Sequence, residues 1–213
     1  MPNKTDREYR SMTLAVEERA EEGQERMVVS GYASTFDEPY KLWEDDSVEV
    51  WEKVDRSAFD ETDMSDVIMQ YDHAGRVFAR IRNNTLTVNP DERGLFISAD
   101  LSGTDIGRSL YQEIAGGYTD RMSFGFTVDE DVREIVDDRT TGKSIVIRTI
   151  TKVGKLYDVS AVSLPANPGT SISARFLDGA IEEARAERLK AQELEEKREQ
   201  IMKRAEALGK VEA

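Results

Sequence analysis

His73 is the chain's single histidine, and it lies in the segment MQYDHAGR directly after a run of apolar residues. Histidine is the side chain whose ordinary pKa lets it exchange a proton near neutral pH. If the protein performs general acid–base chemistry through an imidazole, this residue must supply it. An ordinary surface histidine is the alternative, and position alone favours that alternative.

Ser123 lies in the strand-like segment RMSFGFTV. Side chains alternate along a strand, so Met122 and Phe124 are predicted on one face and Ser123 and Gly125 on the other. A hydroxyl beside a glycine on a rigid strand suits a nucleophile, provided that a base lies within hydrogen-bond reach. Taken alone, the segment is better explained by small residues on a solvent-facing side of the strand.

Asp158 lies in KLYDVSAVSL, a run of mostly apolar or small residues that predicts a buried strand. A buried carboxylate needs a partner, because an isolated one is very costly. Orienting an imidazole is one such partnership, and a structural bond to an arginine or to the backbone is the alternative. Asp72 and Asp100 are rivals for the orienting role.

The sequence gives little support for cysteine chemistry, a metal site or a phosphate-binding loop. The chain has no cysteine, which excludes disulfides, thiolate metal sites and cysteine nucleophiles. One histidine without cysteine makes a zinc site a poor interpretation, and we expect no metal and no cofactor. The Gly142–Ser144 segment is similar to the end of a phosphate-binding loop, but Asp137 stands where that pattern needs its first glycine.

The charge balance limits the partners. The chain has 43 acidic against 29 basic residues, a net charge of -14. Nucleic-acid binding needs a basic face, so DNA and RNA are not expected as partners, while a basic partner stays open. No apolar stretch approaches the roughly 20 residues that span a bilayer, and the N-terminus lacks the apolar core of a signal peptide. We therefore expect an intracellular protein without a membrane partner.

Short strands must position these residues. Alternating runs predict a hairpin that begins at Ser11, a strand that ends at His73 and a hairpin around the turn NPDERG. Segment 104–117 predicts a helix, with a cap at its start and two glycines at its end. Two further strands are predicted on either side of the turn DDRTTG. Many strands and one internal helix favour a small barrel or sandwich with helices attached.

The composition divides the chain into three parts. Residues 1–10 are polar and predicted to be disordered, 11–178 to form one domain, and 179–213 to form a charged helical extension. The extension is either a solvated helix or a docking and assembly arm, and the pattern does not separate the two. Three aliphatic residues recur at every seventh position of this part: Leu194, Ile201 and Leu208.

Taken together and in order, several segments within residues 11–177 resemble the HK97-type phage prohead protease family, which is related in fold to the herpesvirus assemblins. Any one of these segments is weak, but their combination is specific. The segments, in chain order, are SGYASTFD, VWEKVDRSAFDET, YDH, GLFISADL, YTDRMSFGF and LYDVSAVSLPANPG.

The resemblance implies a fold and an activity. The expected fold is α+β and mainly β: a small closed or partly open β-barrel of the assemblin type, with peripheral helices and a long C-terminal helix. The expected activity is that of a serine endopeptidase without a cofactor. It would cleave the scaffold segment of the major capsid protein, and itself, inside the immature capsid in the host cytoplasm. Self-association is expected as well.

The resemblance also assigns site residues by position. His73 becomes the general base, Ser123 the nucleophile and Asp158 the third member, at a position where the family commonly has glutamate. By analogy with the assemblin layout, backbone N–H groups of a loop shortly after the acid would form the oxyanion hole. The loop residues expected there are Ala166, Asn167 and Gly169.

Two other classes of function stay open at this point. The first is a non-catalytic capsid-assembly or scaffolding protein that keeps the protease fold and acts through its helical extension. The second is an acidic binding module of unrelated fold, which would make the ordered series of segments a coincidence.

Overall fold

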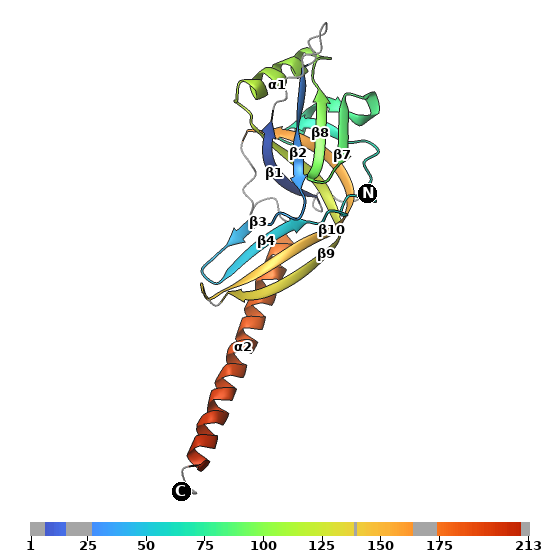
Figure 1. The fold of residues 1–213 in the computed structure, drawn as a ribbon. Coiled ribbons are helices and arrows are strands. Elements are labelled where there is room, and N and C mark those ends of the chain that lie inside the picture. Colours follow the sequence, from blue (N-terminus) through green and yellow to red (C-terminus); the bar gives the residue numbers. More distant parts are fainter. Residues whose placement is uncertain (1–6, 16–26, 139, 164–173, 210–213) are drawn as a thin grey trace.

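The computed structural model describes residues 7–15, 27–138, 140–163 and 174–209. The described chain is mainly β-strand, with one short helix beside the strands and one long helix at the C-terminal end (Figure 1). The strands are β1 (Glu8–Ala15), β2 (Val28–Thr35), β3 (Tyr40–Glu44), β4 (Val48–Val54), β5 (Ile68–Tyr71), β6 (Ala74–Arg80), β7 (Leu86–Pro90), β8 (Gly94–Asp100), β9 (Arg121–Asp138) and β10 (Lys143–Val162). The helices are α1 (Asp105–Ala115), α2 (Ala174–Gly209) and the short 3-10 turn η2 (Ile81–Asn83).

The strands pair in the order β3-β4-β10-β9-β1-β2-β8-β7, and β5 joins β10 and carries β6 on its other side. Strand β10 pairs with β9 along its length in antiparallel fashion. On its other side it pairs in parallel with β4 through its first half and with β5 through its second half. β10 is therefore the strand that connects the two ends of the sheet.

The closed form of the expected barrel is not found in the described residues. The two outer strands of the path, β3 and β7, pair only with β4 and β8. Figure 1 shows that β3 and β4 lie along the lower part of β9 and β10, whereas β7 and β8 lie beside their upper part. The edge strands β3 and β7 thus lie apart along this ribbon, and β6, a third edge strand, pairs with β5.

The long strands β9 and β10 bend between these two ends. Their pairing register shifts at several points between Ile150 and Asp158. Such bulges bend a strand and increase its twist. We call Arg121–Phe126 with Leu156–Val162 the proximal half of this ribbon, and Val128–Asp138 with Lys143–Ile150 the distal half.

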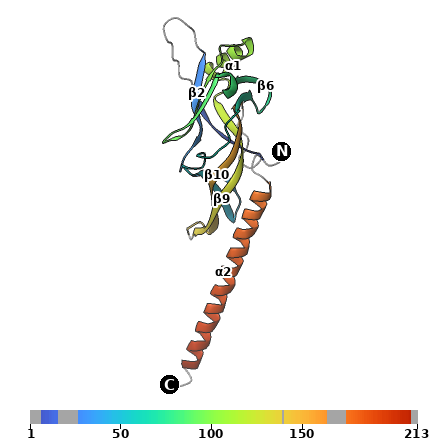
Figure 2. The same ribbon diagram turned by 90° about the vertical axis from the view of Figure 1, so that its right-hand side faces the viewer.

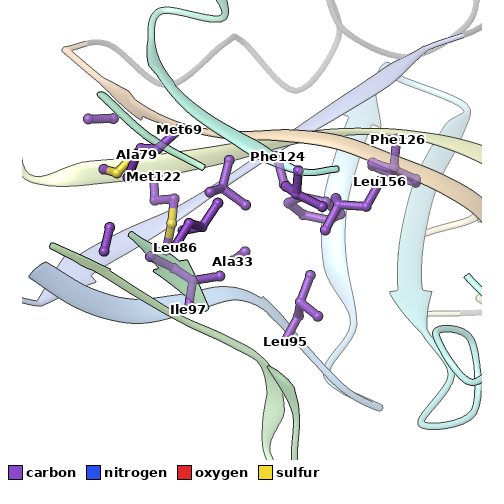
Figure 3. Packing of buried hydrophobic residues seen from close by; sticks show 14 of the residues in the cluster. Ala33, Met69, Ala79, Leu86, Leu95, Ile97, Met122, Phe124, Phe126 and Leu156 are labelled. Atoms are coloured by element: carbon purple, nitrogen blue, oxygen red, sulfur yellow. The ribbon is translucent and has the colours of Figure 1, made fainter. Parts of the chain in front are cut away.

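The main hydrophobic core lies on one face of the proximal half (Figure 3). Helix α1 adds Leu110 and Ile114 to it, and the Thr104 side chain caps this helix by accepting a hydrogen bond from the Gly107 N–H. This confirms the helix predicted within 104–117. Fully buried members of the core include Met69, Leu95, Ile97, Met122, Phe124, Phe126 and Leu156.

A smaller core fixes helix α2 to the distal half. Ala180 and Ala184 of α2 pack against side chains of β3, β4 and β10. Beyond this contact the helix extends away from the strands (Figure 2), and it exposes Leu194 at 54% and Ile201 at 66%. The predicted helical extension thus begins as a helix at Ala174, a few residues before position 179.

The N-terminal expectation needs a correction. Residues 8–10 were predicted to be disordered, but β1 begins at Glu8, and Glu8 and Arg10 are buried. Their charges are matched by Glu52 and Arg148, far along the chain. Burial of polar residues by such distant partners leaves no local signal in the sequence. Residues 1–6 lie outside the described chain.

Candidate active site

His73 is presented by the tight turn that joins β5 to β6. Tyr71 pairs with Ala74, and the two residues between them, Asp72 and His73, have φ angles of 46° and 56°. Positive φ at both central residues is the pattern of a type I′ hairpin turn, and aspartate and histidine tolerate this region better than most residues. The Asp72 N–H donates to the Ala161 carbonyl at 3.0 Å, which fixes the turn against β10.

Ser123 lies on the proximal half of β9, on the face opposite the main core. The predicted alternation is correct, because Met122 and Phe124 point into that core. The serine itself is not solvent-facing, since only 1% of it is exposed. In the pairing of β9 with β10, Ser123 lies opposite Ser160.

The structure brings His73, Ser123 and Asp158 together in one hydrogen-bonded row. The His73 Nε2 atom lies 2.7 Å from Ser123 Oγ, and its Nδ1 atom lies 2.5 Å from Asp158 Oδ1. An ionised carboxylate only accepts hydrogen bonds, so the Nδ1–H donates to it and Nε2 is left to accept from the serine hydroxyl. This order is the one that general-base activation of a serine requires.

Asp158 is 3% exposed and held from a second side. The Ser160 hydroxyl donates to Asp158 Oδ1 at 2.8 Å, and Ser160 is fully buried. Ser160 was not among the site residues predicted from the sequence. Its signal was present in the segment DVS, because residues two apart on a strand share a face.

In the part of the chain that the structure describes, neither rival acid is hydrogen-bonded to the imidazole. Asp72 accepts a long contact of 3.4 Å from the Ser163 N–H. Asp100 accepts from the N–H and the hydroxyl of Ser102, and it thereby stabilises the turn before α1. Asp158 is therefore the acid that the fold places against Nδ1.

The aromatic ring of Tyr9 covers the imidazole. The ring centroids of Tyr9 and His73 are 4.3 Å apart, with the planes tilted by 59°. The imidazole is thus enclosed between a serine, a carboxylate and an aromatic ring, and its side chain is 17% exposed. Tyr9 was not predicted as a site residue, because residues 1–10 were expected to be disordered.

Three sequence-based expectations concern other parts of the site. The residues expected at the oxyanion hole, Ala166, Asn167 and Gly169, lie outside the described residues. Within the ranges that the structure describes, no group of three or more metal-binding side chains is arranged to hold an ion. Over the same ranges, neither α1 nor α2 is long and apolar enough to cross a membrane.

Comparison with known proteins adds one finding. A family model described as caudovirus prohead serine protease matches residues 14–184 of the chain. No curated protein and no solved structure matches the chain. The matched range contains the three residues of the hydrogen-bonded row and ends within helix α2, whereas Tyr9 lies before it.

Proposed function

Because the chain belongs to the caudovirus prohead serine protease family, we propose that it is a capsid-maturation endopeptidase with Ser123 as its nucleophile. Its proposed substrates are the scaffold segment of the major capsid protein and the chain itself. The proposed place of action is the interior of the immature capsid. No cofactor enters the proposed reaction.

One observation carries this proposal. Ser123 and Asp158 lie 50 and 85 positions after His73 in the sequence. The three residues nevertheless form the continuous row Ser123 Oγ, His73 Nε2, His73 Nδ1 and Asp158 Oδ1. A serine hydroxyl is a poor nucleophile unless a base removes its proton. A purely structural protein has no need for a buried serine aligned with its single histidine.

The first step acylates the enzyme. As Ser123 Oγ bonds to the scissile carbonyl carbon, its proton passes to His73 Nε2, and the carbonyl oxygen takes the negative charge. The imidazolium then donates this proton to the leaving amine as the peptide C–N bond breaks. Water then attacks the acyl enzyme, and His73 again takes up the proton and passes it on. This step releases the product with its free carboxyl group and restores the serine hydroxyl and the neutral imidazole.

Asp158 stabilises the imidazolium and fixes its tautomer during both steps. Ser160 supports this role, because its hydrogen bond keeps Oδ1 in place on the Nδ1 side of the ring. The oxyanion donors are proposed to be backbone N–H groups of residues 166–169. A relation to the assemblin fold is part of the same proposal, and it rests on the order of the sequence segments.

Helix α2 supports a role in assembly beside the proteolytic one. Its outer half exposes large apolar side chains to solvent, among them Leu194, Ile201 and Met202. Exposed apolar side chains on a projecting helix suit contacts with a capsid protein or with a second copy of the chain. Self-association through α2 stays a prediction.

The proposal is tested by co-expression of the full chain with its phage's major capsid protein, including the scaffold segment. The capsid protein is then analysed by intact-mass spectrometry. With the wild type we expect a shortened capsid protein with one defined new end. With Ser123→Ala we expect the full-length species. Equal processing by both chains would contradict the proposal.

A further inference from the structure

We propose that Tyr9 is a positioning residue for His73, delivered by β1 and held in place by a buried ion-pair cluster on the opposite face of that strand. This inference rests on the proposed function, since it concerns how the imidazole is kept ready for catalysis. Tyr9 lies before the range that the family model matches, and nothing in the sequence segments discussed above points to it.

The contact between the two rings supplies the first argument. At a centroid distance of 4.3 Å, the Tyr9 ring is in van der Waals contact with the imidazole. It blocks rotation of the imidazole away from Ser123 on that side and excludes water from it. Tilted aromatic pairs at this distance also attract each other, which helps to hold the imidazole in place.

The second argument is the way in which β1 is anchored. Alternation along the strand places Glu8 and Arg10 on the face opposite Tyr9. Arg10 donates to both carboxylate oxygens of Glu52, at 2.5 and 2.7 Å, and to Glu8 at 2.6 Å. Arg148 donates to Glu8 and to Glu52 from the other side. We call these four residues the β1 clamp.

The β1 clamp is charged despite its burial. Burial alone would raise the pKa of Glu52, but the charges and hydrogen bonds of Arg10 and Arg148 outweigh it and hold the pKa below its ordinary value. Burial would likewise lower the pKa of Arg10, and Glu52 with its neighbours raises it instead. A buried network of this kind holds together only while each member keeps its partners, so it fixes the position of β1.

The third argument is the space that Gly125 leaves open. A Cβ atom at position 125 would lie 2.8 Å from Tyr9 Cε1 and 2.6 Å from Asp158 Oδ2. Tyr9 and Asp158 therefore approach the same glycine, and both then contact His73. Because residue 125 of β9 has no side chain, the strand leaves room for both Asp158 and Tyr9.

The test compares Tyr9→Leu, which keeps apolar bulk, with Tyr9→Phe, which keeps the aromatic face. The control is Tyr118→Leu, because Tyr118 is 81% exposed. The readout is the rate at which a fluorophosphonate probe labels the serine. We expect a roughly tenfold slower reaction for Tyr9→Leu, within the range of a lost aromatic pair, and near wild-type rates for the other two. Equal rates for Tyr9→Leu and wild type, or equal losses for Tyr9→Leu and Tyr9→Phe, would overturn the proposal.

A second readout does not depend on catalysis. Because the chain has one histidine, ¹⁵N-labelled imidazole gives one set of ring signals, which belongs to His73. We expect faster exchange of its Nδ1 proton with water in Tyr9→Leu than in Tyr9→Phe. In the wild type we expect a nuclear Overhauser effect between the two rings, and its absence would overturn the proposal even if Tyr9→Leu does not fold. Failure of the protease proposal would instead leave the wild type unlabelled by the probe with these ring signals intact.

Discussion

Strands β9 and β10 build two different regions from the same ribbon (Figure 1). In the proximal half, β1 and β5 flank the pair, and every residue from Met122 to Phe126 is buried. In the distal half, β9 exposes Val132 at 53% and Val136 at 50%. There, within the described residues, β10 is its one strand partner.

The two halves differ because the proposed chemistry needs side chains from several segments held in fixed relative positions. The hydrogen-bonded row takes Ser123 from β9, Asp158 from β10 and His73 from the turn after β5, so three neighbouring segments must be fixed relative to one another. The distal half holds none of these three residues: it contributes Arg148 to the β1 clamp, and it is stabilised by pairing with β4 and by packing against helix α2. Matched substitutions in the two halves should therefore differ in their effect on activity.

The largest difference is expected between two aspartates of the ribbon. Asp158→Asn should lower the rate of peptide cleavage by about 10⁴-fold, because an amide favours the wrong imidazole tautomer. Asp137 in the distal half accepts a hydrogen bond from Ser144 at 2.9 Å, and Asp137→Asn should leave the rate unchanged. The measurement is cleavage of a capsid-protein substrate by each purified chain. Near wild-type activity of Asp158→Asn would remove Asp158 from the proposed mechanism.

A smaller but still large difference is expected between two glycines. Gly125→Ala places a methyl group 2.6 Å from a carboxylate that the hydrogen bonds of His73 and Ser160 hold in place. The row must shift, which should slow cleavage on the order of 100-fold. The three atoms nearest to a Cβ at Gly154 all belong to the exposed carboxylate of Asp129, which can move aside. Equal activity of the two variants would mean that the row tolerates displacement.

Two buried serines of β10 offer the closest match. Ser160 donates to Asp158 at 2.8 Å and Ser144 to Asp137 at 2.9 Å. Each change to alanine should lower the free energy of unfolding by about 1 kcal/mol, measured by urea denaturation. Only Ser160→Ala should also slow cleavage, by about tenfold, because a bond to a charged group is lost in the proposed site. A similar loss of activity in Ser144→Ala would contradict a special role for the proximal half.

The smallest effect concerns the acid stability of the turn between β3 and β4, which is hydrogen-bonded to Ser144 of the distal half. Burial alone would raise the pKa of Asp45, but hydrogen bonds from Ser47, Val48 and Arg185 of α2 lower it to about 2. The stability that such a carboxylate contributes is present above its unfolded pKa of about 4 and is lost as the pH falls towards 2. The melting temperature of Asp45→Asn should therefore fall less steeply than that of the wild type over this interval. Parallel curves would show that Asp45 contributes nothing.

Much of the proximal half could be predicted from the sequence. The alternation in RMSFGF placed Ser123 opposite the core, and the single histidine left one choice of imidazole. Helix α1 was predictable because Thr104 and two glycines mark its ends. Each of these features depends on neighbours within a few residues, which is the range over which a sequence pattern carries information.

The rest depends on partners far apart in the chain. Glu8 and Arg10 are polar in sequence, and their burial depends on Glu52 and Arg148, which lie far along the chain. The parallel pairing of β10 with both β4 and β5 likewise leaves no local pattern, so this pairing was not predicted. Tyr9 was missed for the same reason, since its place over His73 follows from the anchoring of β1.

The central claim is that His73 activates Ser123, and intact-mass spectrometry after reaction with a fluorophosphonate probe tests it most directly. We expect one covalent adduct on the wild type and none on Ser123→Ala or His73→Ala, with all three chains folded by circular dichroism. An adduct on Ser123→Ala would place the reactive hydroxyl elsewhere. Labelling of His73→Ala at the wild-type rate would show that the imidazole does not activate the serine, and it would contradict the account.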